Sequence, residues 1–155
     1  MSNDFDYRAV PYGFVHCFNG GCPLADGCLR HLAARHAPAS AVFLTTVNPA
    51  AYPGQGEACP HFRGARRIRT AWGLTGAFDA IPHKTAVKLK GGIRRLFSKT
   101  TYYRILNKER SLSPAEQEAI ARIFEEQGIT EAVAYDSYEE AYDWEDRDVA
   151  GKESR

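Results

Sequence analysis

The four cysteines are the residues of this chain best suited to do chemistry. All of them lie within the first 59 of 155 residues, at Cys17, Cys22, Cys28 and Cys59. Four thiolates can complete a tetrahedral zinc site or hold an iron–sulfur cluster. Because a reducing cytosol keeps thiols free, cysteines gathered in this way are more often metal ligands than disulfide partners. We therefore predict one metal centre per chain, with these four cysteines as its ligands.

The spacing C-x4-C-x5-C-x30-C favours an iron–sulfur cluster of the 4Fe-4S type over zinc. Zinc ribbons and knuckles use close cysteine pairs, and only Cys17 and Cys22 could form such a pair here. Iron–sulfur loops tolerate irregular spacing and often place proline after a ligand, as in Cys22-Pro23 and Cys59-Pro60. Zinc stays open as an alternative, and so does a site without metal whose thiols are buried or redox-active.

Three histidines, His16, His31 and His61, lie close to the cysteines in sequence. Imidazole is a common metal ligand, so each of them could replace a thiolate. A histidine beside a ligand can also support that ligand by a hydrogen bond or simply face solvent. The sequence leaves the role of all three histidines open.

The net charge of +1 hides a strong asymmetry along the chain. Residues 1–62 carry a net charge of −1, residues 63–110 carry +11 and residues 111–155 carry −9. A basic block followed by an acidic one indicates an anionic partner for the basic block and an acidic tail that competes for it. The alternative is that the two blocks screen each other on the surface.

Residues 63–130 are predicted to form an array of four helices. Apolar residues recur with helical spacing from Ile68 to Phe78 and again from Leu89 to Phe97. The fourth helix has the clearest signals, because Ser113 can cap it, Pro114 fits its first position and Glu116 completes a capping box. The four helices are expected to end at Pro82, Phe97, Asn107 and Gly128.

Residues 91–120 read GGIRRLFSKTTYYRILNKERSLSPAEQEAI. The first two helices of this stretch resemble the helix-turn-helix of repressor-type regulators, whose second helix presents polar and aromatic side chains to DNA. The turn is shorter than in that pattern, since Phe97 leads directly into Ser98. A helical bundle with a solvated basic face is the alternative. The residues expected to contact nucleic acid are Arg94, Arg95, Lys99, Thr101, Tyr103, Arg104, Lys108 and Arg110.

The expected fold class is mainly α with a small β element. A helix is predicted from Leu24 to Arg35, and one strand over Ala41–Val47. We expect a cysteine-rich metal unit (1–62) packed on a four-helix, helix-turn-helix-like array (63–130), as one compact domain. An acidic tail (131–155), disordered from about Glu145 onward, follows it. Three tyrosines of this tail have the spacing of one helical face: Tyr135, Tyr138 and Tyr142.

The expected function is that of a cytoplasmic regulatory protein, associated with DNA or RNA, whose metal centre is structural or senses redox state. The chain has no Gly-rich phosphate loop, no H-E-x-x-H and no nucleophile elbow, so we do not expect an enzyme. No apolar run approaches the roughly 18 residues of a membrane span, so no membrane partner is expected. The alternatives are a metal-stabilised adaptor, whose basic helices dock an acidic partner or the chain's own tail, and a small redox enzyme.

Two resemblances add to these expectations. The segment Cys22-Pro-Leu-Ala-Asp-Gly-Cys28 resembles the CP-x4-C pair of adenine-type DNA glycosylases and of WhiB-like regulators, which implies a cluster. Over about residues 5–144 the chain resembles the bacterial domain of unknown function 6078 family. This resemblance implies that all four cysteines belong to the family pattern, and it leaves the activity open. The motifs that carry it are HCFNGGCPLADGCLRHLA, ACPHF, TAWGL, TTYYR and LSPAEQEAIARIF.

Overall fold

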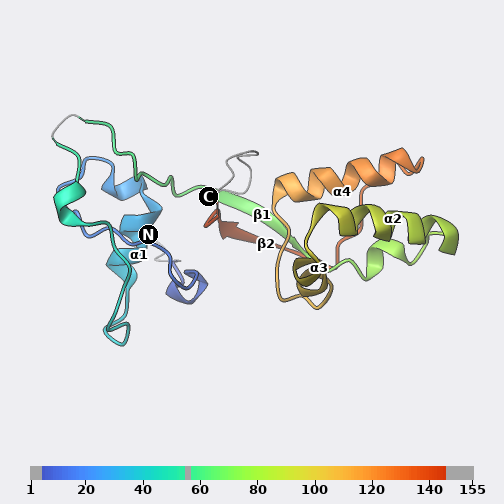
Figure 1. The fold of residues 1–155 in the computed structure, drawn as a ribbon, viewed down its shortest axis with the longest axis horizontal. Helices are drawn as coiled ribbons and strands as arrows, with labels where there is room; N and C mark the ends of the chain where they lie inside the picture. Colours follow the sequence, from blue (N-terminus) through green and yellow to red (C-terminus); the bar gives the residue numbers. More distant parts are fainter. Residues whose placement is uncertain (1–4, 55–56, 146–155) are drawn as a thin grey trace. The chain divides into compact units, whose positions relative to one another are not determined.

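The computed structural model describes residues 5–54 and 57–145 (Figure 1). These residues form a mainly helical protein with four α-helices and one two-stranded antiparallel sheet. The chain divides into two compact units, Met1–Arg66 (unit 1) and Arg67–Arg155 (unit 2). The expected disorder beyond Glu145 lies outside the described residues.

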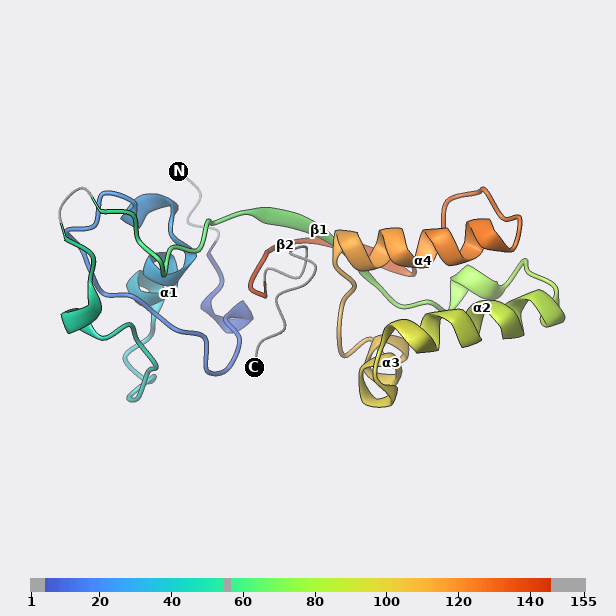
Figure 2. The ribbon, with the colours of Figure 1, turned by 45° about the horizontal axis from the view of Figure 1, so that its top comes forward.

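Unit 1 consists largely of loops around one short helix, α1, which spans Leu29–His36 (Figure 2). The helix predicted from Leu24 begins later because Cys28 has an extended backbone, with φ −99° and ψ 120°. A short 3-10 helix, Ala25–Gly27, precedes Cys28. In the described part of unit 1, the buried apolar residues are only Ala25, Cys28, Leu29, Ala33, Ala34 and Val47.

The strand predicted over Ala41–Val47 is wrong. In this segment only Thr46 makes a β-bridge, to His16. The side chains of Val42 and Phe43 are 76% and 93% exposed. A run of β-branched and aromatic residues becomes a strand only where a neighbouring strand pairs with it along its length, and no such strand lies beside this segment in the described chain.

Unit 2 contains three helices and the sheet. The helices are α2 (His83–Leu96), α3 (Lys99–Leu106) and α4 (Pro114–Glu126), and the strands are β1 (Arg67–Trp72) and β2 (Ser137–Tyr142). The hydrophobic core cluster belongs to this unit. Its members are Ala71, Leu74, Ala77, Leu89, Ile93, Tyr102, Ile105, Leu112, Ile120 and Phe124.

The capping signals read from the sequence for α3 and α4 are confirmed. The Oγ of Ser98 accepts a hydrogen bond from the N–H of Thr101 at the start of α3. At the start of α4, Ser113 and Glu116 form the reciprocal capping box. Beyond α4, Gly128 has a φ of 80°, a conformation that favours glycine and ends the helix.

The first helix predicted for this unit is wrong, because Arg67–Trp72 forms strand β1. Its burial alternates, with Ile68 and Thr70 buried and Arg67 and Arg69 exposed, which is the two-residue period of a strand. The array therefore has three helices rather than four. The helical face expected for the tail tyrosines is also wrong, since β2 pairs antiparallel with β1 and places Glu140 opposite Arg69.

Asp136 ties the segment before β2 to the loop that follows β1. Its carboxylate accepts hydrogen bonds from the N–H of Gly76 at 2.9 Å and of Thr75 at 3.3 Å, and it pairs with Lys108 at 3.5 Å. The hydrogen bond from the N–H of Gly76 is the main cause that lowers the pKa of this carboxyl below its usual value. Thr75 and Lys108 also lower the pKa, whereas burial raises it. Gly73, with φ 74°, lacks the Cβ that would overlap this carboxylate.

Replacing Asp136 by asparagine is expected to destabilise unit 2 at pH 7 by about 1.5–3 kcal/mol, the range for hydrogen bonds to a charged group. Because the pKa of Asp136 is lower in the folded state, its ionised form stabilises the fold above the unfolded pKa, about 3.9. This stabilisation is lost as the pH falls through the folded pKa. Urea unfolding at neutral pH and at about pH 3 measures the effect. An equal difference between wild type and variant at both pH values would contradict this role.

Candidate functional site

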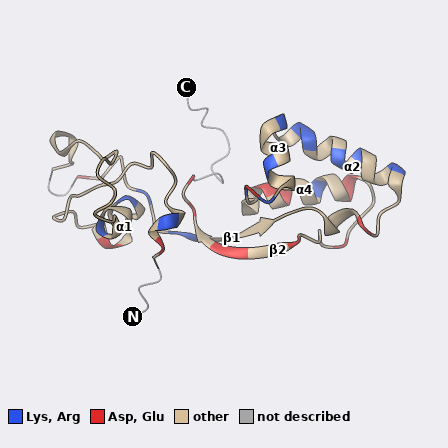
Figure 3. Cartoon of the chain, turned by 90° about the horizontal axis from the view of Figure 1, so that it is seen from below, with Lys and Arg blue, Asp and Glu red and all other residues tan. Residues whose placement is uncertain are grey.

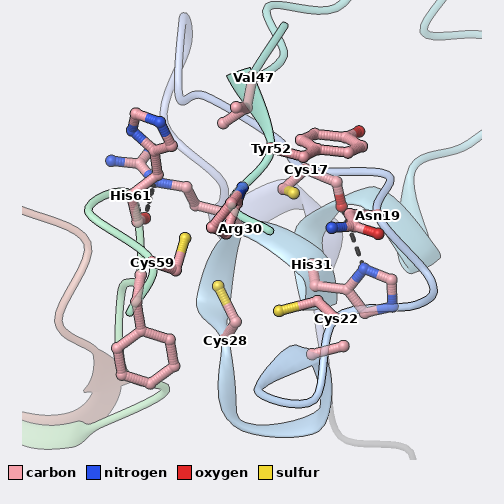
Figure 4. A pocket seen from close by; sticks show the side chains of 13 residues that line it. Cys17, Asn19, Cys22, Cys28, Arg30, His31, Val47, Tyr52, Cys59 and His61 are labelled. Carbon is pink, nitrogen blue, oxygen red and sulfur yellow. Dashed lines mark hydrogen bonds between the residues drawn. The ribbon is translucent and has the colours of Figure 1, made fainter. Parts of the chain in front are cut away.

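The four cysteines of unit 1 line one cavity (Figure 4). They reach it from different parts of the unit. Cys22 lies in a turn, where its N–H donates a hydrogen bond to the carbonyl of Asn19. Cys28 immediately precedes α1. Cys59 begins a turn closed by the N–H of Phe62. The structure thus brings together all four residues that the spacing singled out as metal ligands.

The thiols are free, and they surround the cavity rather than converging on one point. Cys28 is buried, and Cys17, Cys22 and Cys59 are half-buried. Within residues 5–54 and 57–145, no three His, Cys, Asp or Glu side chains are placed to hold a single metal ion. The cavity has a volume of about 20 Å³, enough for about one water molecule. The chemistry of the donor set fits a four-thiolate centre.

The three histidines take different positions. His31 and His61 line the cavity, and Nδ1 of His31 lies 3.1 Å from the carbonyl oxygen of Cys17. His16 does not line it. Its side chain is buried, with Nε2 2.8 Å from the hydroxyl of Tyr7 and Nδ1 3.2 Å from the carbonyl oxygen of Thr45. Because both of its ring nitrogens have partners, His16 supports the loops of unit 1.

Arg30 places a positive charge at the cavity wall and ties three segments together. Its Nε donates to the carbonyl of His61 at 2.8 Å, and one terminal nitrogen donates to the carbonyl of Val15 at 3.0 Å. Burial is the main cause that lowers the pKa of this guanidinium, and Arg63 adds to the effect. The charges of the cysteine thiolates act in the opposite direction. The guanidinium of Arg30 nevertheless stays charged at neutral pH.

Tyr52 completes the wall beside Cys17. Burial is the largest cause that raises the pKa of its hydroxyl, and the charge of Cys17 and a side-chain hydrogen bond with that residue add to it. Tyr52 is therefore a neutral donor beside the thiol of Cys17. Sequence reasoning missed both Arg30 and Tyr52, because neither belongs to a spacing pattern of metal ligands.

The residues predicted to contact nucleic acid lie in unit 2, on α2, α3 and the loop after α3. Figure 3 shows Lys and Arg along α2 and α3, and Asp and Glu on α4 and β2. The side chains of Arg94, Arg95, Lys99 and Arg104 are exposed, and Tyr103 is 47% exposed. Together with Lys108, these residues form the exposed part of the predicted surface.

The side chains of three predicted residues form ion pairs or hydrogen bonds within the unit. Arg110 pairs with Glu116 at 2.7 Å, with both side chains less than one-fifth exposed. Lys108 pairs with Asp136, and the Oγ1 of Thr101 accepts a hydrogen bond from Ser98. These contacts give the three side chains a role in the fold. Arg110 links the end of the α3 loop to the capping box of α4.

Three exposed lysines of α2, Lys84, Lys88 and Lys90, were missed by sequence reasoning. The four-residue spacing of Lys84 and Lys88 places them on one helical face, and Arg95 continues that face seven residues further on. The helical period of these cations was the signal that could have revealed them.

The central part of the described acidic tail belongs to the sheet. Residues 137–142 form β2, and Glu139 and Glu140 lie opposite Thr70 and Arg69 of β1. Within the described chain, the ion pair that joins the tail to the predicted nucleic-acid residues is the one between Lys108 and Asp136.

Among the described residues, no helix combines the length and the apolar composition that a membrane span needs.

The fold and the site define a mainly helical protein with a cavity lined by four free cysteines in unit 1 and a basic helical surface in unit 2. The chain matches the family of unknown function DUF6078 over residues 1–144 and therefore belongs to that family. This match confirms the family resemblance of its motifs. No curated protein and no solved structure matches the chain.

Proposed function

We propose that the chain is a nucleic-acid-associated regulatory protein whose unit 1 folds around a metal centre bound by Cys17, Cys22, Cys28 and Cys59. The observation that carries the proposal is the position of all four thiols around one cavity. We place the protein in the cytoplasm, where thiols stay reduced and available to a metal.

The sparse core of unit 1 supports a structural role for the metal. The hydrophobic core cluster lies in unit 2, whereas half of the buried apolar residues described in unit 1 are alanines. Small units with few buried apolar side chains are commonly stabilised by disulfides or metals, and the four cysteines form no disulfide. Metal binding would therefore supply folding free energy to unit 1.

A 4Fe-4S cluster is favoured over zinc as the centre. The irregular spacing of the four cysteines and the prolines that follow Cys22 and Cys59 are typical of cluster-binding loops. In a cluster each thiolate binds a different iron. A bound cluster would supply one-electron redox chemistry, and zinc would supply stability alone.

Arg30 supports either metal centre through its positive charge and its hydrogen bonds. Four thiolates carry four negative charges, and the guanidinium at the cavity wall offsets part of that charge. Its hydrogen bonds to the carbonyls of Val15 and His61 also hold the segments that precede Cys17 and follow Cys59.

The absorption spectrum of protein purified without oxygen tests the metal part of this proposal. We expect a broad visible band that bleaches when the cluster is reduced, because iron–sulfur clusters are coloured and redox-active. Colourless protein that contains zinc would replace the cluster by the alternative centre. Folded protein with neither iron nor zinc would overturn the proposal.

The nucleic-acid part rests on the exposed cations of α2 and α3. If Arg94, Arg95, Lys99 and Arg104 each neutralise one phosphate, the logarithm of the affinity for duplex DNA should fall against the logarithm of salt concentration with a slope of roughly −3 to −4. Binding measured over a range of salt concentrations gives this slope. Absence of binding to duplex DNA and structured RNA at low salt would contradict it.

A protein-interaction adaptor is the second candidate. The observation that favours it is the exposure of apolar side chains in unit 1, where Tyr12, Val42 and Phe43 are largely exposed. Exposed apolar groups of this kind often mark sites of protein association. A protein partner that binds the wild type and is lost from the variant Phe43→Ser would support this adaptor.

A further inference from the structure

Gly91 lies at the centre of the solvent-facing side of α2. This helix buries Ala86, Leu89 and Ile93 against the core of unit 2. At about 100° per residue, Gly91 lies opposite the middle of that buried stripe. The exposed face of α2 is therefore centred on a residue without a side chain.

Packing within the described chain gives no reason for glycine at this position. A Cβ added to Gly91 would meet no atom within 4 Å, and Gly91 is not among the residues with positive φ. Its neighbour Gly92 differs, because a Cβ there would lie 2.9 Å from Cγ2 of Ile123 on α4. Gly92 is thus explained by the contact between α2 and α4, and Gly91 is not.

Glycine inside a helix destabilises it relative to alanine. Where backbone conformation and packing do not require it, the remaining advantage of glycine is that another molecule can approach the helix backbone closely. The residues around Gly91 indicate the charge of that molecule. Lys84, Lys88 and Arg95 lie on the same face, and Arg94 lies on its other side.

These four cations are exposed, and none of them forms an ion pair within residues 5–54 and 57–145. Lys84 and Arg95 are separated by about 16 Å along the helix axis, at 1.5 Å per residue. The basic face thus forms a row along the helix (Figure 3). An anion bound among these like charges would offset their mutual repulsion.

We propose that the sugar–phosphate backbone of a nucleic acid crosses α2 at Gly91, with its phosphates bound by Lys84, Lys88 and Arg95. The charges of a nucleic acid lie on its backbone, so close approach to a helix surface strengthens its contacts. The carboxylates of an acidic protein lie at the ends of side chains and need no such approach. This inference rests on the nucleic-acid part of the proposed function and extends that surface along α2.

The variant Gly91→Ala separates binding from stability. Alanine should raise the melting temperature, because it strengthens the helix and meets no neighbour. Its methyl group should also hold the phosphates away and weaken binding by about fivefold, the size of one lost hydrogen bond. The probes are a mixed-sequence DNA duplex of about 20 base pairs and one of its single strands, at about 50 mM salt.

Two further variants complete the experiment. Gly20→Ala, a change at another open glycine outside α2, should leave binding unchanged. Lys88→Gln should weaken binding and make the salt slope on the duplex shallower by about 0.9, because one phosphate contact is lost. The single strand shows whether the surface requires a duplex. Because the proposed contact is to one backbone, Gly91→Ala should weaken the binding of both the duplex and the single strand.

The outcomes distinguish this inference from the function on which it rests. Wild-type protein that binds neither probe overturns both. Wild-type binding that Gly91→Ala does not weaken overturns the inference alone, as does a variant less stable than wild type. Polyglutamate that binds more tightly than the duplex and is equally sensitive to Gly91→Ala assigns the face to an acidic protein and overturns the inference.

Discussion

The variant Cys28→Ser is expected to lose the metal centre and to unfold unit 1 while unit 2 stays folded. Cys28 is 7% exposed, lies between the 3-10 helix and α1, and makes a β-bridge to Gly64. A structural zinc centre contributes roughly 10–16 kcal/mol in small metal-folded domains, far more than the sparse core of unit 1 can replace. Metal analysis and limited proteolysis followed by mass spectrometry measure both effects, with the expected cleavage confined to residues 5–66.

The matched control is His31→Ala, a change at a residue that lines the same cavity. Because the proposal assigns the metal to the four thiols, this variant should retain its metal and its resistance to protease. Loss of metal from His31→Ala as complete as from Cys28→Ser would make His31 a ligand instead. A Cys28→Ser protein with wild-type metal content and protease resistance would contradict the assignment of the cysteines.

The variant Arg104→Glu is expected to weaken nucleic-acid binding by more than about tenfold at about 50 mM salt, because it removes one phosphate contact and adds a repulsive charge. Arg104 is exposed on α3. The loss should be similar for unrelated duplex sequences, because phosphates carry no sequence information. Fluorescence anisotropy with two unrelated duplexes measures it.

Arg122→Glu provides the control for net charge, because it makes the same change at an exposed residue of α4. Equal losses in the two variants would show that total charge, rather than the surface of α2 and α3, determines binding. Tyr103→Ala tests base reading. It should change the preference among sequences only if α3 enters a groove.

The helices of unit 2 could be predicted where their signals are local. Ser98 lies three residues before Thr101, whose N–H donates to its hydroxyl. Ser113 lies three residues before Glu116, its partner in the capping box. Strand β1 could not be predicted in this way. Its partner β2 lies in the acidic tail, with Arg67 opposite Tyr142, and a strand is stabilised by such distant pairing. The helical spacing of apolar residues after Ile68 was coincidental.

The candidate site could be predicted in part for the same reason. Cysteine type and spacing identified four of the residues that line the cavity. Arg30 and Tyr52 reach that cavity only through the fold of the loops. The sequence predicted that Lys108 and Arg110 contact nucleic acid. It could not show that they pair with Asp136 and Glu116, because these residues become neighbours only once unit 2 is folded.

The measurement that tests the central claim most directly is the amount of iron, zinc and acid-labile sulfide per chain, in protein purified without oxygen. For a 4Fe-4S centre we expect about four irons and about four sulfides per chain in the wild type, and almost none in a variant with all four cysteines replaced by serine. One zinc and no sulfide would retain the four-cysteine centre with the other metal. Wild-type protein that is folded throughout unit 1 and carries no more metal than the four-serine variant would contradict the claim.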